Sequence, residues 1–342
     1  MDFQQFMSTV PPQYNEYELY QHRREPLLNY VNRYEYLASN CHQRFRSTWQ
    51  KIIQTPDEPH FGAAGLRAEK SITYLCLQYS AGTDLQALRT FYPSILWTWE
   101  EARRYKMLWH DSEDFTNSLS NRVPVLSFAD VEYGRYAIPL ICFGLLLGHA
   151  DLMPRLCWVW DYINEELDYF DILLERLASP FVPGRNKAAK QYTRHLPYRK
   201  LDKVFKASPE ARPALMAKYL DEWYHASRRE PYYNKDDDIV FTGYWSYEAA
   251  AVTWLLGIDD TSYRDMDFYP RDLADFARQF SPQPPIPTGL TAYPGDICPE
   301  TGEWYAIHLG GKKTYIEAGQ TMPGPTRTAT GNLVIWYLQR NR

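Results

Sequence analysis

Apolar residues recur every three or four positions through most of the first 280 residues, which is the spacing of one face of an α-helix. A loop rich in proline and glycine at 55–65 and a polar segment at 111–122 interrupt this pattern. The first helices are expected at 17–54, 69–80 and 84–107. Together these features predict an N-terminal helical domain over residues 1–118.

A second helical unit is predicted over 123–280, and its clearest element runs from 154 to 177. Apolar residues there are spaced alternately by four and three, which predicts one continuous apolar seam along a single helix. Further helices are predicted at 208–227 and 244–257, the second ending where Gly257 suits a left-handed C-terminal cap. The seam consists of Leu156, Trp160, Ile163, Leu167, Phe170, Leu174 and Leu177.

The pattern changes after a proline-rich stretch, 281–287, which is typical of a stiff connector. Beyond it, short segments alternate between apolar and polar positions or are continuously apolar, as β-strands are, with glycine and proline between them. Strands are expected at 304–308, 314–317 and 333–338. The predicted fold class is therefore mainly α, with two helical units in a multi-helix bundle or array and a small, barrel-like β module over 289–342.

Composition narrows the functional classes. A net charge of −5 makes direct nucleic-acid binding a poor fit, because phosphates attract basic surfaces. The longest apolar run, 137–147, is too short to span a bilayer, and the first residues lack the pattern of a signal peptide. The 5 cysteines are scattered and form no CxxC pair. We therefore expect a cytoplasmic protein without membrane contact.

Sequence motifs for catalysis are absent. The 8 histidines form no HExxH or HxH pair, and no phosphate-binding loop, dinucleotide fingerprint or nucleophile elbow occurs, so we expect no metal and no cofactor. One enzyme hypothesis stays open, because aromatic residues make up 16% of the chain and could stack on sugars. It is a helical carbohydrate-active hydrolase with paired carboxylates, for which Glu165, Asp168 and Glu248 are the candidates.

Charge is distributed unevenly along the second unit. Residues 113–178 contain 11 acids and 4 bases, a net charge of −7, whereas residues 179–235 contain 13 bases and 5 acids, a net charge of +8. Residues 236–282 return to −7, with 10 acids and 3 bases. Either acidic and basic segments neutralise each other across the packing, or an acidic face is exposed and mimics or competes with a polyanion.

Beside the apolar seam, Asn164, Asp168, Asp171 and Glu175 share one strip of the predicted helix. Like charges at this spacing destabilise an isolated helix by about 0.2–0.5 kcal/mol per pair. Either the strip is a plain solvated face, or intramolecular arginines, a metal or a basic partner offset these charges. Glu248 presents a different problem, since it lies in a segment that is apolar on all sides. A buried carboxylate must be paired, hydrogen-bonded or protonated, and we expect an arginine of a neighbouring helix as its partner.

Three segments resemble the PoNi-like immunity proteins, the inhibitors of polymorphic nuclease toxins delivered by type VI and related secretion systems. They are Gly243 to Ala251, Gly257 to Asp265, and Tyr269 to Leu273. The resemblance implies an all-α fold, no enzymatic activity, and binding of a cognate toxin, a DNase above all. Because the matching segments are apolar or sit at caps, we expect a mainly structural role for the family residues Trp245, Glu248, Asp259, Asp260, Arg264 and Asp265.

The resemblance and the charge pattern together predict a toxin inhibitor that uses acidic and aromatic surface. A nuclease is electropositive where it holds phosphates, so acidic side chains complement it. The expected contacts are Asp161, Glu165, Asp168, Asp171, Glu175, Asp236, Asp237 and Asp238. The β module is an extension for which three roles stay open: a second toxin contact, a homodimer interface or a stabilising cap.

Overall fold

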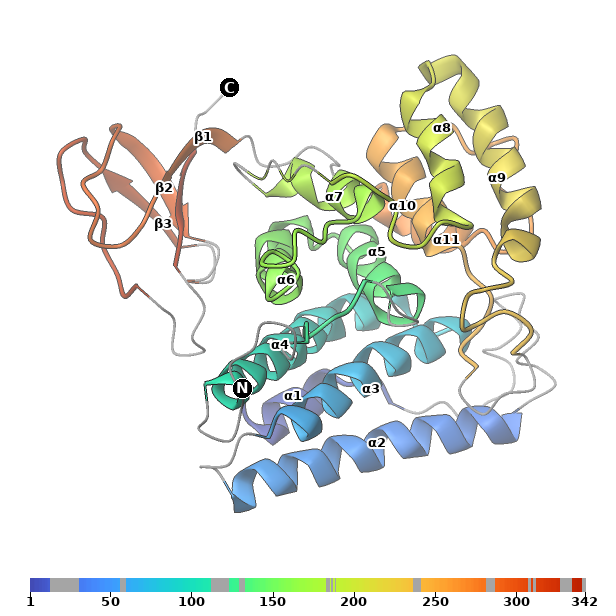
Figure 1. The fold of residues 1–342 in the computed structure, drawn as a ribbon, viewed down its shortest axis with the longest axis horizontal. Helices are drawn as coiled ribbons and strands as arrows, with labels where there is room; N and C mark the ends of the chain where they lie inside the picture. The colour runs from blue at the N-terminus through green and yellow to red at the C-terminus, as the bar shows by residue number, and fades with distance from the viewer. Residues whose placement is uncertain are drawn as a thin grey trace.

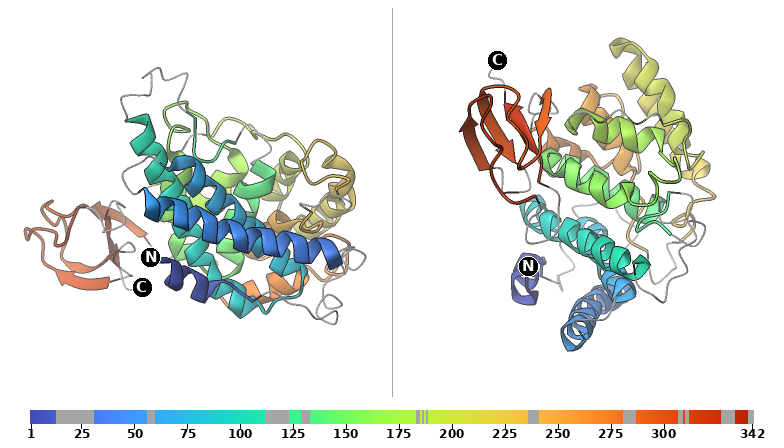
Figure 2. Two further views of the ribbon diagram at one scale, coloured as in Figure 1. Left: turned by 90° about the horizontal axis from the view of Figure 1, so that it is seen from below. Right: turned by 60° about the vertical axis from the view of Figure 1, so that its left-hand side comes forward.

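The computed structural model describes most of the 342 residues. The described residues are 1–12, 31–55, 60–111, 123–128, 133–182, 185, 187, 189–235, 241–280, 287–306, 309, 312–326 and 334–339. All structural statements below concern these residues. Helices dominate, and a small sheet stands at the C-terminal end of the chain, so the predicted mainly α fold is confirmed (Figures 1 and 2).

The N-terminal helices form one layer of the molecule. They are α1 (Phe3–Thr9), α2 (Val31–Gln54), α3 (Phe61–Ser80) and α4 (Leu85–His110). The three long helices α2, α3 and α4 lie side by side (Figure 1). Asp84 begins α4, where its carboxylate accepts a backbone N–H of the first turn at 3.0 Å.

The helices predicted in this layer are confirmed where the structure describes them. Two boundaries differ: α3 begins earlier than predicted, and α4 ends later, at His110. Helix α3 begins at Phe61, inside the predicted loop 55–65, although Gly62 lowers the helix propensity there. Its first turns bury Ala64 and Arg67, and this packing outweighs the propensity of the local sequence. Residues 13–30 and 112–122 lie outside the described residues, so the start of the predicted helix 17–54 and the polar segment 111–122 are left aside.

The second group of helices surrounds α5, which is buried at every position. Its α-helices are α5 (Ile138–Leu146), α6 (Met153–Asp161), α7 (Ile172–Ala178), α8 (Asp202–Lys206), α9 (Arg212–Ala226), α10 (Tyr247–Leu256) and α11 (Arg271–Ala277). Short helical turns join them: the π-helix η4 (Tyr133–Ala137) and the 3₁₀ turns η5 (Ala150–Leu152), η6 (Ser179–Phe181), η7 (Tyr198–Leu201) and η8 (Pro209–Ala211). Helix α5 packs against α3, α4, α6, α7, α10 and α11.

The single helix predicted from 154 to 177 is wrong. Helix α6 ends at Asp161, and α7 begins only at Ile172. Between them, Ile163 and Asp168 have φ values of 67° and 51°, which a right-handed helix excludes. Most seam residues are nevertheless buried, since two short helices and a turn direct them inward. The exception is Leu167, which is 47% exposed.

Helix α10 ends as predicted. Gly257 follows its last residue with φ 60° and ψ 38°, the left-handed conformation of a C-terminal cap.

We expect Gly257→Ala to lower the free energy of unfolding by about 1 kcal/mol, because only the backbone conformation opposes a Cβ there. Gly62→Ala is the matched control. It lies in helix α3 with open space around it, so the same substitution should stabilise the protein by about 0.5–1 kcal/mol. Urea denaturation measures both, and a destabilising effect at both positions would contradict this assignment.

The C-terminal module is a four-stranded antiparallel sheet in the order β1-β4-β2-β3. Its strands are β1 (Pro287–Ala292), β2 (Gly302–Ala306), β3 (Lys312–Ile316) and β4 (Trp336–Gln339). Residues of one face, among them Trp304, Trp336 and Leu338, form a small core of their own. On the other face, the rings of Tyr305 and Tyr337 pack at 5.4 Å between centroids.

The two helical groups share one hydrophobic core, which runs from Phe6 to Ala277, whereas the β module has a separate core. The division into 1–118, 123–280 and 289–342 remains a proposal about folding units. None of the described helices has both the length and the apolar character needed to cross a membrane.

Candidate functional site

Two of the acidic residues predicted to contact a partner are held by Arg185. Its guanidinium donates to both carboxylate oxygens of Asp161 at 2.8 Å, and to those of Glu175 at 2.5 and 2.7 Å. The Arg185 side chain is only 4% exposed. Burial raises the pKa of the Glu175 carboxyl, and the hydrogen bonds from Arg185 oppose that shift. These three residues form a buried ion cluster that joins α6 to α7.

Two further acids lie on the surface. Glu165 pairs with Lys187 and Asp168 pairs with Lys190, and the two carboxylate side chains are 57% and 63% exposed. Exposed ion pairs contribute at most about 1 kcal/mol, so a partner can displace these lysines at low cost. The carboxylates of Glu165 and Asp168 are therefore accessible at the surface.

Asp171 has a structural role instead of the predicted position on an exposed helical strip. It is fully buried and caps α7, accepting the backbone N–H groups of Leu173 at 2.8 Å and Leu174 at 3.0 Å. Its second oxygen accepts the Thr193 N–H at 2.7 Å. The prediction of a shared strip is wrong because residues 162–171 are not helical. Asp236, Asp237 and Asp238 lie outside the described residues.

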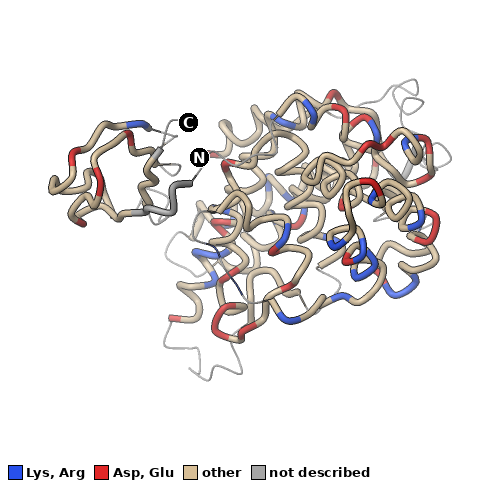
Figure 3. Tube along the Cα trace, turned by 90° about the horizontal axis from the view of Figure 1, so that it is seen from above, with Lys and Arg blue, Asp and Glu red and all other residues tan. Residues whose placement is uncertain are grey.

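Asn164, the fourth residue of that predicted strip, is buried as well, and its side chain donates to the Leu126 and Trp160 carbonyls. Three bases of 179–235, namely Arg185, Lys187 and Lys190, pair with acids that precede them in the chain. Acidic and basic segments alternate closely along the helical part of the molecule (Figure 3). Of the two hypotheses for the uneven charge, the ion pairs of Arg185, Lys187 and Lys190 support mutual neutralisation.

The family residue Glu248 lies in the core at the start of α10. One carboxylate oxygen accepts three hydrogen bonds, from the hydroxyls of Tyr219 at 2.6 Å and Ser246 at 2.8 Å, and from the Trp223 indole at 2.7 Å. The prediction of an arginine as the partner of Glu248 is therefore wrong, since these three uncharged donors take that place. Burial raises the pKa of Glu248, and the hydrogen bonds partly oppose the shift. The carboxyl therefore stabilises the core as an acceptor.

The other family residues organise the segment between α10 and α11. Asp260 is nearly buried and accepts from Arg264 at 3.4 Å, Arg278 at 2.6 Å and the Tyr269 hydroxyl at 3.1 Å. Asp265 pairs with Arg271, and Asp259 accepts the Thr261 N–H at 3.0 Å. Trp245 lies before α10 and donates to the Ser80 hydroxyl at 2.8 Å, which connects the start of α10 to α3.

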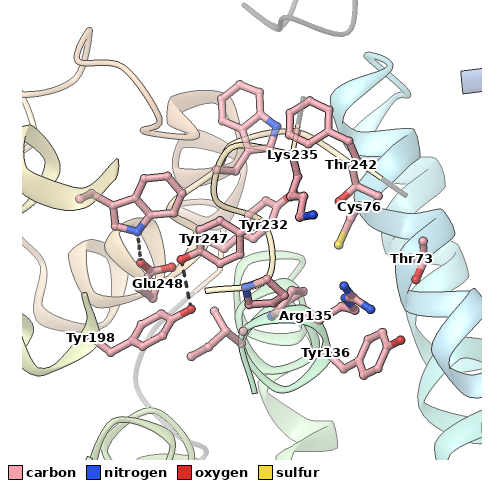
Figure 4. Close-up of a pocket in the computed structure, with 18 of the residues that line it drawn as sticks. Thr73, Cys76, Arg135, Tyr136, Tyr198, Tyr232, Lys235, Thr242, Tyr247 and Glu248 are labelled. Atoms are coloured by element: carbon pink, nitrogen blue, oxygen red, sulfur yellow. Dashed lines mark hydrogen bonds between the residues drawn. The ribbon is translucent and has the colours of Figure 1, made fainter. Parts of the chain in front are cut away.

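A cavity of about 110 Å³ opens beside Glu248 (Figure 4). Helix α3, the π-helix η4, α10 and residues within 231–235 and 241–245 line it. Figure 4 shows Arg135 and Lys235 converging on the space that faces Thr73 and Cys76 of α3. The remaining lining is largely aromatic, and its rings belong to Tyr136, Tyr198, Trp223, Tyr232, Phe241, Trp245 and Tyr247.

Residues 169–273 match the family model described as PoNe immunity proteins (PoNi), C-terminal. The family found for this segment is that of the PoNi immunity proteins. The predicted resemblance is thereby confirmed for the part of the chain that carries the three segments.

The crystal structure of protein PA2201 from Pseudomonas aeruginosa has a similar fold, with a TM-score of 0.61 and 22% sequence identity. The alignment covers 80% of this chain and 97% of that chain. At this identity the likeness concerns the fold alone. A search of curated proteins gave no match.

The cavity is built jointly by the PoNi C-terminal domain and the helices before it. Tyr198, Trp223, Tyr232 and Glu248 come from the domain, whereas η4 and α3 supply the opposite wall. Glu230 of the domain lies behind this lining, where it binds Arg194 at 2.7 Å. Sequence reasoning missed the cavity residues other than Trp245 and Glu248, because no local pattern distinguishes them.

The enzyme alternative required paired carboxylates in a cleft. Of its three candidates, only Glu248 lines the cavity, whereas Glu165 and Asp168 pair with lysines at the surface. The described residues contain no cluster of three or more His, Cys, Asp or Glu that could hold a metal. The 5 cysteines are buried and free.

Proposed function

We propose that this chain is an immunity protein that binds a cognate nuclease toxin, a DNase of a type VI secretion system, and neutralises it. The observation that carries the proposal is the PoNi C-terminal domain at residues 169–273. The family is one of immunity proteins, and such proteins act by binding. The nuclease activity, the secretion route and the cytoplasmic site of action follow from the resemblance and belong to the proposal.

Burial reduces the set of acidic residues that we propose as toxin contacts. Asp171 and Glu175 are buried, so we place the acidic contact at Glu165 and Asp168, with the partly exposed Asp161 beside them. Asp236 to Asp238 remain part of the proposal on sequence alone. Acidic side chains at the rim of an interface steer a basic partner and raise its association rate.

The hydrolase alternative has less support. A cavity of about 110 Å³ is smaller than the roughly 300–1,000 Å³ typical of ligand pockets, so it does not suit an oligosaccharide. Glu248 accepts three buried donors, which leaves that oxygen poorly placed for proton transfer to a sugar. Binding therefore explains the geometry better than hydrolysis does.

The first experiment is to co-purify the chain with the product of the neighbouring gene and to assay that product on DNA with and without the chain. We expect a stable complex and loss of DNA cleavage. An active toxin that forms no complex with the chain would contradict the proposed function.

The acidic contact is tested by neutralising Glu165 and Asp168 together, as E165Q and D168N. Asparagine is chosen at 168 because the φ of 51° there suits Asn better than lysine. We expect the association rate with the toxin to fall roughly threefold to tenfold, with a weaker dependence on salt. The exposed Asp221 on α9, changed to Asn, is the control. An equal effect of both variants in biosensor kinetics would remove the acidic contact.

A further inference from the structure

We propose that the β module joins two copies of this chain, with β3 of one copy paired antiparallel to β3 of the second copy across a two-fold axis at Tyr315. Of the three roles left open for the module, this is the homodimer interface, and it does not depend on toxin binding. The open edge of the sheet, the exposure of the Tyr315 ring and the order of charges along the strand each support this assignment.

The edge of the sheet at β3 is open. The strand order β1-β4-β2-β3 places β1 at the edge nearest the helices and β3 at the opposite edge (Figure 1). Strand β3 pairs with β2 on one side, and no other segment of the described residues forms backbone hydrogen bonds with its other side. An open edge presents unpaired N–H and C=O groups, so a further strand can extend the sheet there.

The sheet face opposite the small core becomes more exposed toward this edge. Tyr337 of β4 and Tyr305 of β2 face each other and are 2% and 9% exposed. Tyr315 of β3 lies on the same face and is 67% exposed. Aromatic pairs across neighbouring strands are stabilising, and tyrosine is enriched where proteins meet. The Tyr315 ring is therefore the part of this face that a further strand would cover.

The order of charges along β3 selects a second copy as the partner and fixes the register. Residues that face each other across an antiparallel pair lie on the same side of the sheet, so the two-fold axis passes through one residue of the strand. With the axis at Tyr315, Lys313 of each copy faces Glu317 of the other, which gives two pairs of opposite charge. An axis at Lys313 would set like charges against each other, and an axis at Thr314 or Ile316 would form no charge pair.

Both charged side chains are available for this pairing. The Lys313 ammonium lies 3.7 Å from the Glu303 carboxylate of its own copy, and the two side chains are 53% and 44% exposed, so that pair holds the lysine only weakly. The Glu317 side chain is exposed and forms no ion pair with any described residue. Lysine alone would shield an edge from a second strand, whereas opposite charges that face each other stabilise the pairing.

The first test is the oligomeric state of the full chain, measured without toxin by sedimentation equilibrium over a concentration series. A single strand pair is smaller than the interfaces of stable complexes, so we expect a dimer with a dissociation constant on the order of 10 µM. Lys313→Glu and Glu317→Lys should each weaken association by about tenfold or more, since each creates two pairs of like charge. Lys203→Glu, an exposed base on α8, is the matched control and should leave association unchanged.

A mixture of the two weakened variants separates charge pairing from damage to the fold. In a mixed dimer of Lys313→Glu and Glu317→Lys, both facing pairs again have opposite charges. A one-to-one mixture should therefore associate about as tightly as the unmodified chain, although neither variant alone does so. A monomer at every concentration, equal association of all variants, or no recovery in the mixture would overturn the proposal.

A cysteine substitution tests the position of the axis. The two Tyr315 residues face each other, and facing Cα atoms of an antiparallel pair lie about 4.5–5.5 Å apart, within reach of a disulfide. Tyr315→Cys should form a covalent dimer with diamide as the oxidant, and the 5 natural cysteines are buried, so they should not compete. Lys313→Cys is the control, because its two Cα atoms would lie roughly 14 Å apart. No covalent dimer of Tyr315→Cys, or one that forms equally fast with Lys313→Cys, would overturn the proposed pairing.

Discussion

Glu248→Ala is expected to lower the free energy of unfolding by about 5 kcal/mol, the largest effect we predict for one side chain. The substitution removes the acceptor of three buried donors, on Tyr219, Trp223 and Ser246. Each buried donor left without a partner costs about 1–3 kcal/mol. Because natural domains are stable by about 5–15 kcal/mol, the variant should be close to unfolded at room temperature. Urea denaturation monitored by tryptophan fluorescence measures the loss.

Glu248→Gln separates the hydrogen bonds from the charge. The amide oxygen keeps an acceptor for the three donors, and glutamine cannot ionise, so this variant should remain folded. A stable alanine variant would show that the three donors find other partners, and would remove Glu248 from the account of the core.

The pH dependence of stability, compared between the unmodified protein and Glu248→Gln, tests whether the Glu248 carboxyl is protonated. Burial raises the pKa of Glu248 above its ordinary value of 4.5, so the folded state favours the proton. The stability gained from that proton is complete below pH 4.5 and is lost as the pH rises through the folded-state pKa. The advantage of glutamine over glutamate should therefore be small at pH 4 and grow toward pH 8. Asp221→Asn serves as the exposed control, with no comparable trend expected. If the unmodified protein is more stable than Glu248→Gln at pH 8, the hydrogen-bond donors lower the pKa of Glu248 by more than burial raises it.

Local patterns predicted the parts of the fold that local physics determines. The left-handed cap at Gly257 and the long apolar faces of α2 to α4 follow from neighbouring residues alone. The PoNi segments were identified by resemblance to the family and not from local patterns.

The error between α6 and α7 has a physical cause. Helical spacing of apolar residues reports which side chains are buried, and two short helices joined by a turn can bury the same set. In the structure, the left-handed conformations of Ile163 and Asp168 interrupt the helix, and Asp171 begins α7 as its N-cap. A β-branched residue with positive φ is uncommon, and tertiary packing imposes it here.

The cavity was beyond sequence reasoning because its residues come from distant segments. Lys70, Arg135, Tyr198 and Lys235 have no distinguishing neighbours in the chain, and only the packing of α3 against η4 and the PoNi domain brings them together. The alternation of net charge along 113–282 left mutual neutralisation as one of two hypotheses, and it did not indicate which arginine would bind which acid.

Arg185→Met is expected to lower the free energy of unfolding by about 3–5 kcal/mol. Removing one partner of a buried ion cluster leaves uncompensated charge, here on Asp161 and Glu175, whose side chains are 18% and 9% exposed. The loss should be concentrated at the junction of α6 and α7, which hydrogen exchange can locate. This effect is much larger than that of the surface pairs, so Lys190→Met, with both partners more than half exposed, should change stability by less than about 1 kcal/mol.

The triple variant Asp161→Asn, Glu175→Gln, Arg185→Met distinguishes charge from packing. If unpaired charge causes the loss, neutralising both acids should restore most of the stability of Arg185→Met, because amides tolerate burial better than carboxylates. If the triple variant is as unstable as the single one, the methylene packing of Arg185 carries the effect instead.

The same variants also bear on the toxin contact, since Glu165 and Asp168 lie on the turn that this cluster holds in place. If the turn stays intact in the triple variant, Glu165 and Asp168 should still bind the toxin although Asp161 has lost its charge. A marked loss of toxin affinity in this variant would instead place the contact nearer to α6.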